Sequence, residues 1–311
     1  MIPPEINDSD PVFEVAIVGG GPAGLSAGVW LGRYLRRVVL IDAGDPRNWE
    51  TRGINGFLGH RSVTPAELRG RGRDDCREFG VQLVDDEVQR VARDGEGFRL
   101  QLAGGGSATA QRLLLAFGLR DVWPDIPGLE RCYGETVHVC PDCDGYEARD
   151  RKTLVIGTGR KAVGMALALH TWTHEIVICT NGDPADMDGE LCSKLDSLGI
   201  PLIEAAIRGM RSSEGEVQTA ELENGMHLDC ERVFFSIGQF PADDLGTQLG
   251  CARDEHGQIE VDHKGATSVE HVYAAGDITP GPQLATVAAA SGAVAALAIH
   301  RSLLPEVQTL E

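Results

Sequence analysis

The sequence predicts an α/β protein with two Rossmann-like nucleotide-binding domains, the second inserted into the first. A β-rich run, a glycine loop and a helical run follow one another near the amino terminus, and the same succession returns about 140 residues later. Strands that alternate with helices are typical of parallel sheets covered by helices. A chain of 311 residues has room for one domain around each unit.

The first unit predicts a dinucleotide site. Residues 12–18 form a β-rich run that passes into a Gly-x-Gly-x-x-Gly loop, and residues 25–31 follow as a helix. In such a loop Gly19 allows the tight turn and Gly21 lets the backbone approach a pyrophosphate. Gly24 allows the helix to pack closely on the strand, and the helix start directs free amide groups at the phosphates.

Two carboxylates indicate which dinucleotide binds. The next strand, residues 37–41, ends on Asp42, whose carboxylate is suited to a ribose diol. A strand near the carboxyl terminus ends on Gly276 and Asp277, and a helix of small residues follows over 284–298. This second carboxylate and helix start reach toward the same crevice. FAD needs such an anchor for its long ribityl chain and NAD does not, so the pair predicts FAD.

The second unit predicts the inserted domain. A strand over 153–156 leads into a glycine loop over 157–162, a helix through His170 and a strand over 175–179. Linker-like residues occur at 123–128 and 238–241, where proline and glycine interrupt the pattern. We therefore expect an FAD-binding domain made of residues 1–120 and 243–311, and an inserted pyridine-nucleotide-like domain over 121–242.

Cys140 and Cys143 are the candidate redox pair. Two thiols three residues apart can close a small, reducible disulfide, and the pairing can lower the pKa of one thiol below its usual value of about 8.5. Asp144 could shuttle a proton during this exchange, although a turn residue before a glycine is the alternative. A zinc site would need more ligands than His138 alone, and the chain has no second C-x-x-C, so we expect no metal.

Composition excludes several classes of partner. The net charge of −19 argues against nucleic acid and anionic membranes as main partners. No apolar run reaches the roughly 18 residues that a membrane span needs. Residues 1–10 lack the basic and apolar regions of a signal peptide, so we expect a cytoplasmic protein.

The order of these motifs over nearly the whole chain resembles that of the low-molecular-weight thioredoxin reductases. The resemblance implies a homodimeric FAD-dependent disulfide oxidoreductase in which Cys143 faces the flavin. Cys140 would then exchange with the disulfide of a thioredoxin-like protein or a small molecule. Relatives usually carry an arginine before Gln283, where this chain has Pro282. The implied cofactor contacts are Gly19, Gly21, Pro22, Ala23 and Asp42 for the ADP half, Val88 for the adenine, Asn55 for the flavin, and Asp277 and Gln283 for the ribityl chain and ring.

The inserted domain departs from the family pattern where a phosphorylated nicotinamide would bind. Relatives usually carry a His-Arg-Arg type run after the second strand, whose guanidiniums bind the 2′-phosphate. Here residues 180–184 contain no cation, and Asp183 would repel a phosphate. Arg160 and Lys161 also replace an acidic–small pair in the glycine loop. We therefore expect that NADPH is not used. NADH stays open, because Asp183 is a carboxylate near the strand but badly placed for a ribose.

Three functions remain open at this point. A reductase-like enzyme could receive electrons from ferredoxin or another flavin carrier. A flavin-dependent dithiol oxidase would pass electrons to oxygen; residues 55–60 resemble that branch, whereas its members commonly carry His where this chain has Asp144. A flavin-bound redox sensor would not turn over. Arg69, Arg73 and Arg77 share one face of an expected helix, which either docks an acidic protein or is a solvated face.

Overall fold

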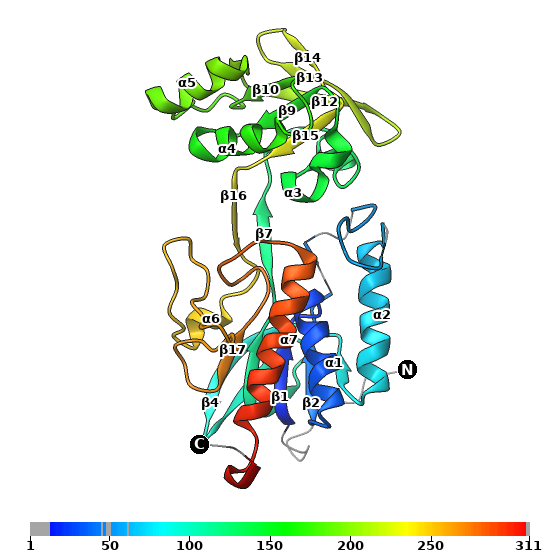
Figure 1. Ribbon diagram of the computed structural model, residues 1–311, viewed down its shortest axis with the longest axis vertical. Coiled ribbons are helices and arrows are strands. Elements are labelled where there is room, and N and C mark those ends of the chain that lie inside the picture. Colours follow the sequence, from blue (N-terminus) through cyan, green and yellow to red (C-terminus); the bar gives the residue numbers. More distant parts are fainter. Residues whose placement is uncertain (1–12, 45, 48–50, 61, 309–311) are drawn as a thin grey trace.

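The computed structural model describes residues 13–44, 46–47, 51–60 and 62–308, and it divides them into two lobes joined by a narrow ribbon (Figure 1). Residues 1–10, on which the expected absence of a signal peptide rests, lie outside this range. Within the described residues, no helix is both long and apolar enough to cross a membrane.

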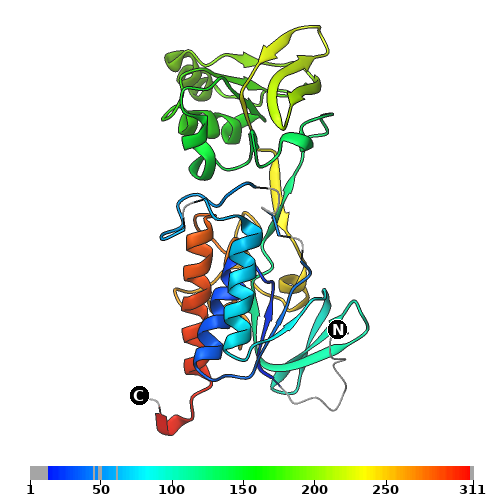
Figure 2. The ribbon, with the colours of Figure 1, turned by 90° about the vertical axis from the view of Figure 1, so that its right-hand side faces the viewer.

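The first lobe is built on a seven-stranded sheet of order β3-β2-β1-β6-β5-β4, with β17 paired to the end of β6. Strand β2 is buried at all four positions, as expected where both faces of a parallel sheet are covered. Helices α1, α2 and α7 cover one face (Figure 2), and α6 packs over the other. The elements of this lobe are β1 (Phe13–Val18), α1 (Pro22–Arg33), β2 (Val38–Ile41), α2 (Pro65–Glu78), β3 (Gln82–Val84), β4 (Val88–Asp94), β5 (Gly97–Leu102), β6 (Ser107–Leu115), α6 (Leu245–Gln248), β17 (Val272–Ala274) and α7 (Ala285–Ser302), followed by a 3-10 turn at Glu306–Gln308.

The second lobe repeats the arrangement on a smaller scale. Five parallel strands lie in the order β11-β10-β9-β15-β8, with α4 and α5 on one face and a three-stranded antiparallel sheet on the other. Its elements are β8 (Val137–His138), α3 (Pro141–Asp144), β9 (Thr153–Ile156), α4 (Gly159–Leu169), β10 (Ile176–Cys179), α5 (Gly189–Leu198), β11 (Leu202–Ile203), β12 (Ile207–Ser213), β13 (Glu216–Leu222), β14 (His227–Asp229) and β15 (Arg232–Phe235), with 3-10 turns at Glu130–Cys132 and Gly145–Ala148.

The ribbon consists of β7 (Leu119–Val122) and β16 (Gly238–Pro241), which pair antiparallel. The chain leaves the first lobe through β7 and returns through β16, so the second Rossmann-like domain is inserted into the first, as predicted. We propose that the domain limits lie at this ribbon, between residues 120 and 121 in β7 and between 242 and 243 just after β16.

The helix α3 positions the site. This four-residue helix hangs from the second lobe and points toward the first lobe, above the amino-terminal ends of α1 and α7 (Figure 1). It contains Cys143, and Cys140 is the residue that caps its start. The redox motif of one domain is thereby presented to the glycine loop of the other.

Candidate functional site

The first glycine loop forms an open cradle at the start of α1. Gly19 has a φ of +108°, and a Cβ there would lie 2.3 Å from the carbonyl oxygen of Ala116. A Cβ at Gly21 would meet nothing within 4 Å, so space lies beside the helix start. No side chain caps α1, which leaves its first amide groups available to a phosphate. At Gly24 a Cβ would lie 1.9 Å from the Gly19 carbonyl, which is the close packing expected there.

A cavity of about 810 Å³ extends from this cradle to the cysteine pair, and we call it the main cavity. Its volume lies within the range of roughly 300–1,000 Å³ that is usual for ligand and cofactor sites. The expected residues that line it are Gly19, Gly21, Pro22, Ala23, Asp42, Asn55, Val88, Cys143, Asp144, Gly276, Asp277 and Gln283. Gly24 packs behind the loop. The uncapped helix start and the open space at Gly21 fit the pyrophosphate of a dinucleotide.

Asp42 has partners that the sequence did not lead us to expect. Its Oδ2 forms ion pairs with Arg69 and, at 3.4 Å, with Arg73, both from α2. Its Oδ1 accepts a hydrogen bond from the Gly44 amide at 3.3 Å. Both arginines are largely buried, and Arg69 also lines the main cavity. Of the face considered for docking an acidic protein, only Arg77 is exposed, and it pairs with its neighbour Asp74.

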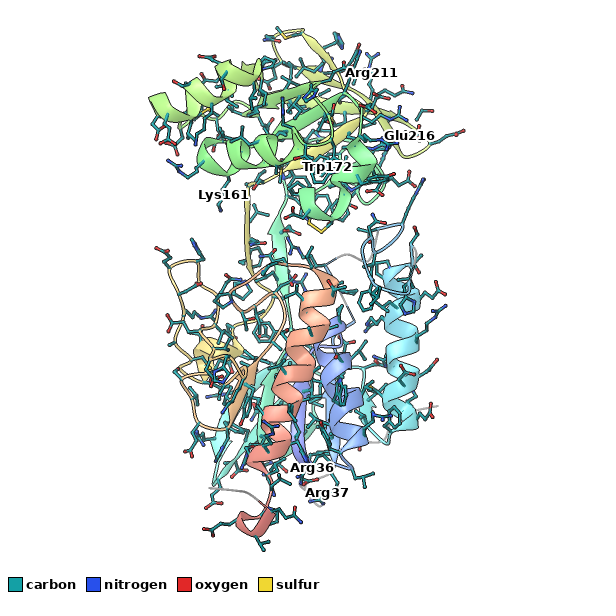
Figure 3. The ribbon with its side chains drawn as sticks, viewed as in Figure 1. Arg36, Arg37, Lys161, Trp172, Arg211 and Glu216 are labelled. Carbon is teal, nitrogen blue, oxygen red and sulfur yellow. A yellow bond between two sulfur atoms is a disulfide. The ribbon has the colours of Figure 1, made fainter. Side chains whose placement is uncertain are left out.

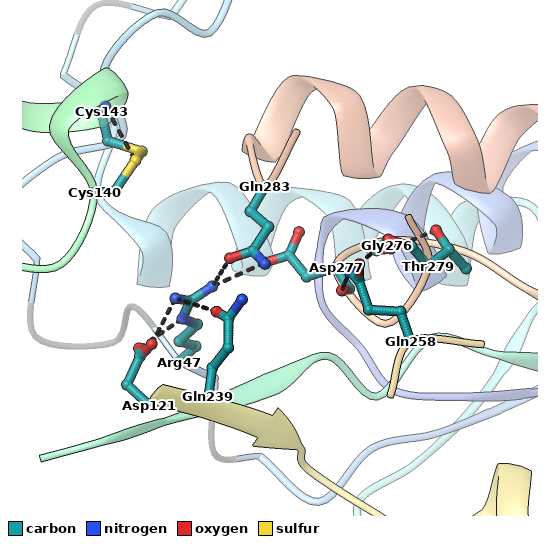
Figure 4. A network of polar contacts seen from close by, with 10 residues as sticks. All are labelled: Arg47, Asp121, Cys140, Cys143, Gln239, Gln258, Gly276, Asp277, Thr279 and Gln283. Atoms are coloured by element: carbon teal, nitrogen blue, oxygen red, sulfur yellow. Dashed lines mark hydrogen bonds and ion pairs between the residues drawn. A yellow bond between two sulfur atoms is a disulfide. The ribbon is translucent and has the colours of Figure 1, made fainter. Parts of the chain in front are cut away.

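Arg47 is the principal residue that sequence reasoning missed. It donates to Gln283 Oε1 at 2.8 Å and lies 3.4 Å from Asp277 Oδ2 (Figure 4). A cation therefore does lie beside Gln283, although Pro282 takes the place of the usual arginine. Burial raises the pKa of Asp277, and the charge of Arg47 opposes this shift. The sequence held no signal for Arg47, because it comes from a loop 236 residues before Gln283.

The two cysteines face different cavities. Cys140 and Cys143 form a disulfide, and the Cys143 amide donates to the Cys140 sulfur at 3.1 Å. Cys143 lines the main cavity, whereas Cys140 lines a neighbouring cavity of about 350 Å³. Asn55 reaches across from the first lobe, with its Nδ2 3.4 Å from the Cys143 carbonyl oxygen. The disulfide thus joins a residue that lines the main cavity to a residue that lines the neighbouring one.

The environment of Asp144 favours the protonated form of its carboxyl group. Burial, with a further contribution from Glu147, raises its pKa to about 7. Its Oδ2 lies 3.5 Å from Nδ1 of His138. Burial and the charge of Arg232 lower the pKa of His138 to about 4, so this imidazole is neutral near pH 7. Asp144 can therefore gain and lose a proton near neutral pH, next to a neutral partner.

The second glycine loop is closed by the chain itself. The Gly159 amide, at the start of α4, donates to the Ala185 carbonyl oxygen at 2.8 Å. The Asp186 carboxylate lies 3.3 Å from where a Cβ on Gly159 would be. Ala185 is held in turn by Glu204, whose carboxylate accepts from the Ala185 amide at 3.1 Å. The loop between β10 and α5 thereby occupies the position that a pyrophosphate takes at a helix start.

Among the described residues, no group of three or more His, Cys, Asp or Glu side chains is arranged to hold a metal ion.

Comparisons with known proteins agree with this arrangement. The family model described as pyridine nucleotide-disulphide oxidoreductase matches residues 13–292. A probable thioredoxin reductase of Arthroderma benhamiae is 28% identical, with 94% of this chain and 81% of the relative covered. The crystal structure of a putative thioredoxin reductase TrxB from Bacillus anthracis has a TM-score of 0.88 at 28% identity and covers 93% of this chain and 98% of that one.

A second solved structure is more similar in sequence. The crystal structure of HlmI has a TM-score of 0.90 at 33% identity and covers 96% of this chain and 94% of its own. The family match spans most of the chain and includes both glycine loops and the cysteine pair. The chain belongs to the pyridine nucleotide-disulphide oxidoreductase family and is an FAD-dependent disulfide oxidoreductase of the thioredoxin reductase-like class.

Proposed function

We propose that the enzyme moves electrons between FAD and the Cys140–Cys143 pair, and on to the disulfide of a thioredoxin-like protein or a small molecule. The electron donor in this proposal is not NADPH; ferredoxin or another flavin carrier takes that place. By analogy with its relatives, the working form is a cytoplasmic homodimer. The roles of the residues follow from their positions around the main cavity.

One observation carries the proposal: the main cavity is continuous from the cradle at Gly21 to Cys143. Gly21 and Pro22 would hold the pyrophosphate of a dinucleotide, and Asp277 and Gln283, which line the same cavity as Cys143, would contact its other end. FAD, when bound there, supplies two-electron redox chemistry. The main cavity thus joins a cofactor site to a thiol pair that comes from the other domain.

The chain's own groups account for the thiol chemistry. Reduction of the disulfide takes two electrons and two protons and yields two thiols. Asp144 lines the same cavity as Cys143 and, with its pKa near 7, can supply or accept one of these protons. In the reduced pair, the Cys143 amide would stabilise a thiolate at Cys140 through its hydrogen bond to that sulfur. Cys140 is then the nucleophile that attacks the substrate disulfide, and Cys143 resolves the mixed disulfide.

The closed second glycine loop supports a donor other than NADPH. The amide that would bind a phosphate is used by Ala185, and the Asp186 carboxylate lies beside the start of α4. Arg160 does not compensate, because its guanidinium lies 3.6 Å from the carboxylate of Asp188. A dinucleotide would have to displace this loop and bring its phosphates next to a carboxylate, which costs free energy on both counts.

The test is to trap the substrate on each cysteine in turn. The holoenzyme is reduced by light without oxygen and mixed with oxidised thioredoxin or a small disulfide. Cys143→Ser is expected to accumulate a mixed disulfide through Cys140, and Cys140→Ser to accumulate none, as read by mass spectrometry. Cys192→Ser is the control, because Cys192 is an exposed free cysteine of α5, and it should behave as the wild type. Equal reduction of the substrate by Cys140→Ser and the wild type would refute the proposal.

A further inference from the structure

Arg47 joins four parts of the chain that are far apart in sequence (Figure 4). Its Nε and one terminal nitrogen donate to the two carboxylate oxygens of Asp121 in β7, each at 2.6 Å. The same terminal nitrogen lies 3.2 Å from Oε1 of Gln239 in β16. The other terminal nitrogen contacts Gln283 at 2.8 Å and Asp277 at 3.4 Å. One guanidinium therefore ties both strands of the ribbon to two residues of the main cavity.

The ribbon needs such a tie. In the part of the chain that the structure describes, the backbone passes between the lobes in β7 and β16, and a two-stranded ribbon alone is only marginally stable. Contacts that side chains make with the ribbon therefore add to its stability. Arg52 helps from the same side, through its amide to the Gly134 carbonyl at 3.3 Å and an ion pair with Glu135. Arg47 differs from Arg52 in that it also reaches the main cavity.

The contact of Arg47 with Asp121 is built as a fork. Two parallel N–H···O bonds fix the guanidinium plane relative to β7, and the remaining nitrogen is then directed at Gln283. The side chains of Arg47 and Asp121 are 21% and 8% exposed, so water screens the pair little. Burial disfavours the charge of Arg47, but the bond to Asp121 outweighs this and its pKa is raised. A lysine could supply a charge at this position but not the fork.

We propose that Arg47 is a positioning residue for electron transfer: it fixes the ribbon against the loop that carries Asp277 and Gln283, and thereby sets how Cys143 approaches the main cavity. This inference rests on the proposed function, since it concerns transfer between the flavin and the thiol pair. The inference adds Arg47, which contacts neither sulfur of the disulfide, to the residues on which the transfer depends. Misplacement of reacting groups by about 1 Å can slow a reaction about 100-fold, so a loosened ribbon should be visible in the rate.

The experiment measures a single transfer within the holoenzyme. The flavin is reduced by a light pulse without oxygen, and its reoxidation by the Cys140–Cys143 disulfide is followed by absorbance. Arg47→Met is expected to slow this transfer about 10-fold to 100-fold. Arg47→Lys should also be slow, because the charge without the fork does not restore the position. Reoxidation by ferricyanide does not use Cys143 and should be unchanged in both variants.

A matched control exists at the far end of the first lobe (Figure 3). Arg36 is similarly buried, at 14% exposed, and binds Glu14 and His300. Arg36→Met should leave the transfer rate unchanged. If Arg47→Met does not bind flavin, the same rate is measured in Asp121→Asn. This variant loosens the two-bond contact with Arg47 and leaves Gln283 in place. It should slow electron transfer about tenfold. An unchanged rate in Arg47→Met or Asp121→Asn overturns the inference. If the flavin of the wild type were reoxidised no faster than that of Cys143→Ser, the proposed function would be overturned instead.

Discussion

At the scale of single residues, Asp144 is a carboxyl group whose environment differs strongly from water. It is a carboxyl buried beside a cavity, next to the neutral His138 and close to Glu147. Burial penalises its charged form, which raises the pKa to about 7. The same burial that makes it a useful proton carrier must therefore lower the stability of the fold whenever it is charged.

The first prediction concerns stability and pH in Asp144→Asn. The folded pKa of about 7 lies above the unfolded value, so the wild type loses stability as pH rises from about 4 to about 7 and then levels off. A difference of about 3 pKa units is at most about 4 kcal/mol. Asn cannot ionise, so Asp144→Asn should become more stable than the wild type above pH 7, as measured by denaturant unfolding at several pH values.

The same substitution should lower activity. Removing a positioned acid or base commonly costs about 100-fold or more in rate, so disulfide reduction by Asp144→Asn should fall by that order. Asp142→Asn is the control, because Asp142 lies on the same short helix but is exposed. If Asp142→Asn reproduced both effects, a general charge effect would explain the result and the role of Asp144 would be rejected.

The second prediction separates two glycines of the first loop. Gly21→Ala adds a methyl group into open space in the cradle, so it should leave the free energy of unfolding of the flavin-free protein unchanged. It should weaken FAD binding by about 1.4 kcal/mol or more, which is tenfold in Kd. Gly24→Ala places its methyl 1.9 Å from the Gly19 carbonyl and should destabilise the protein itself, by about 1–3 kcal/mol. Flavin titration measures the binding of FAD to both variants, and urea unfolding measures their stability. If neither variant bound flavin more weakly than the wild type, the role of the cradle would be refuted.

Particular residues show what the sequence could predict of the site. Gly21 and the Cys140–Cys143 pair carry local signals, since spacing within a few residues defines their chemistry. The environment of Asp42 was not predictable, because Arg69 and Arg73 reach it from helix α2 and their spacing in the sequence resembles that of a solvent-exposed helix face. Neither was the network around Arg47, whose four partners lie in three segments of the chain far from it in sequence. Contacts between residues that are far apart in the chain leave no local pattern in the sequence.

At the scale of elements, α1 and α7 depend on small residues where they cross. A Cβ on Gly292 would lie 2.0 Å from the Ala23 carbonyl, and Ala288 and Ala295 are buried in the same core. This close approach brings the start of α7 next to the glycine loop. The packing of two helices thereby shapes the main cavity.

The third prediction tests that crossing. Gly292→Ala should destabilise the protein by about 1–3 kcal/mol, because the methyl group forces α7 away from the backbone of α1. Gly70→Ala is the control: it lies in α2, its Cβ would meet nothing within 4 Å, and it should stabilise by about 0.5–1 kcal/mol through helix propensity. Thermal unfolding of both variants measures this. A neutral Gly292→Ala would show that α7 can move without cost.

Elements with a clear pattern were predictable and others were not. The helix expected over 25–31 is Pro22–Arg33, and the strand expected over 37–41 is Val38–Ile41. The antiparallel strands β12 to β14 were not anticipated, because irregular pairing between β12 and β13 interrupts the alternation of polar and apolar residues that indicates a half-buried strand. These strands cover the second sheet but line neither the main cavity nor the cavity at Cys140.

At the scale of the whole molecule, the two glycine loops differ in whether the space beside them is open. The first opens onto a cavity of about 810 Å³, whereas the second is filled by the loop between β10 and α5. Both follow the same strand–loop–helix pattern, so the motif alone did not distinguish them. The difference arises from residues 183–188, which lie outside the motif and fold back onto it. In the function proposed above, the inserted domain therefore serves to carry the thiol pair.

The last prediction follows from that asymmetry. Under anaerobic conditions, NADPH or NADH in excess should leave the flavin of the holoenzyme oxidised, because Ala185 and Asp186 occupy the place of the pyrophosphate. A dithiol added to the same sample should reduce the flavin through the Cys140–Cys143 pair, which would show that the flavin can still accept electrons. Cys143→Ser should lose this reduction by the dithiol. Reduced ferredoxin, tested next, addresses the donor directly. Rapid bleaching of the flavin band by NADPH would mean that residues 183–188 move aside, and the assignment of a different donor would then be wrong.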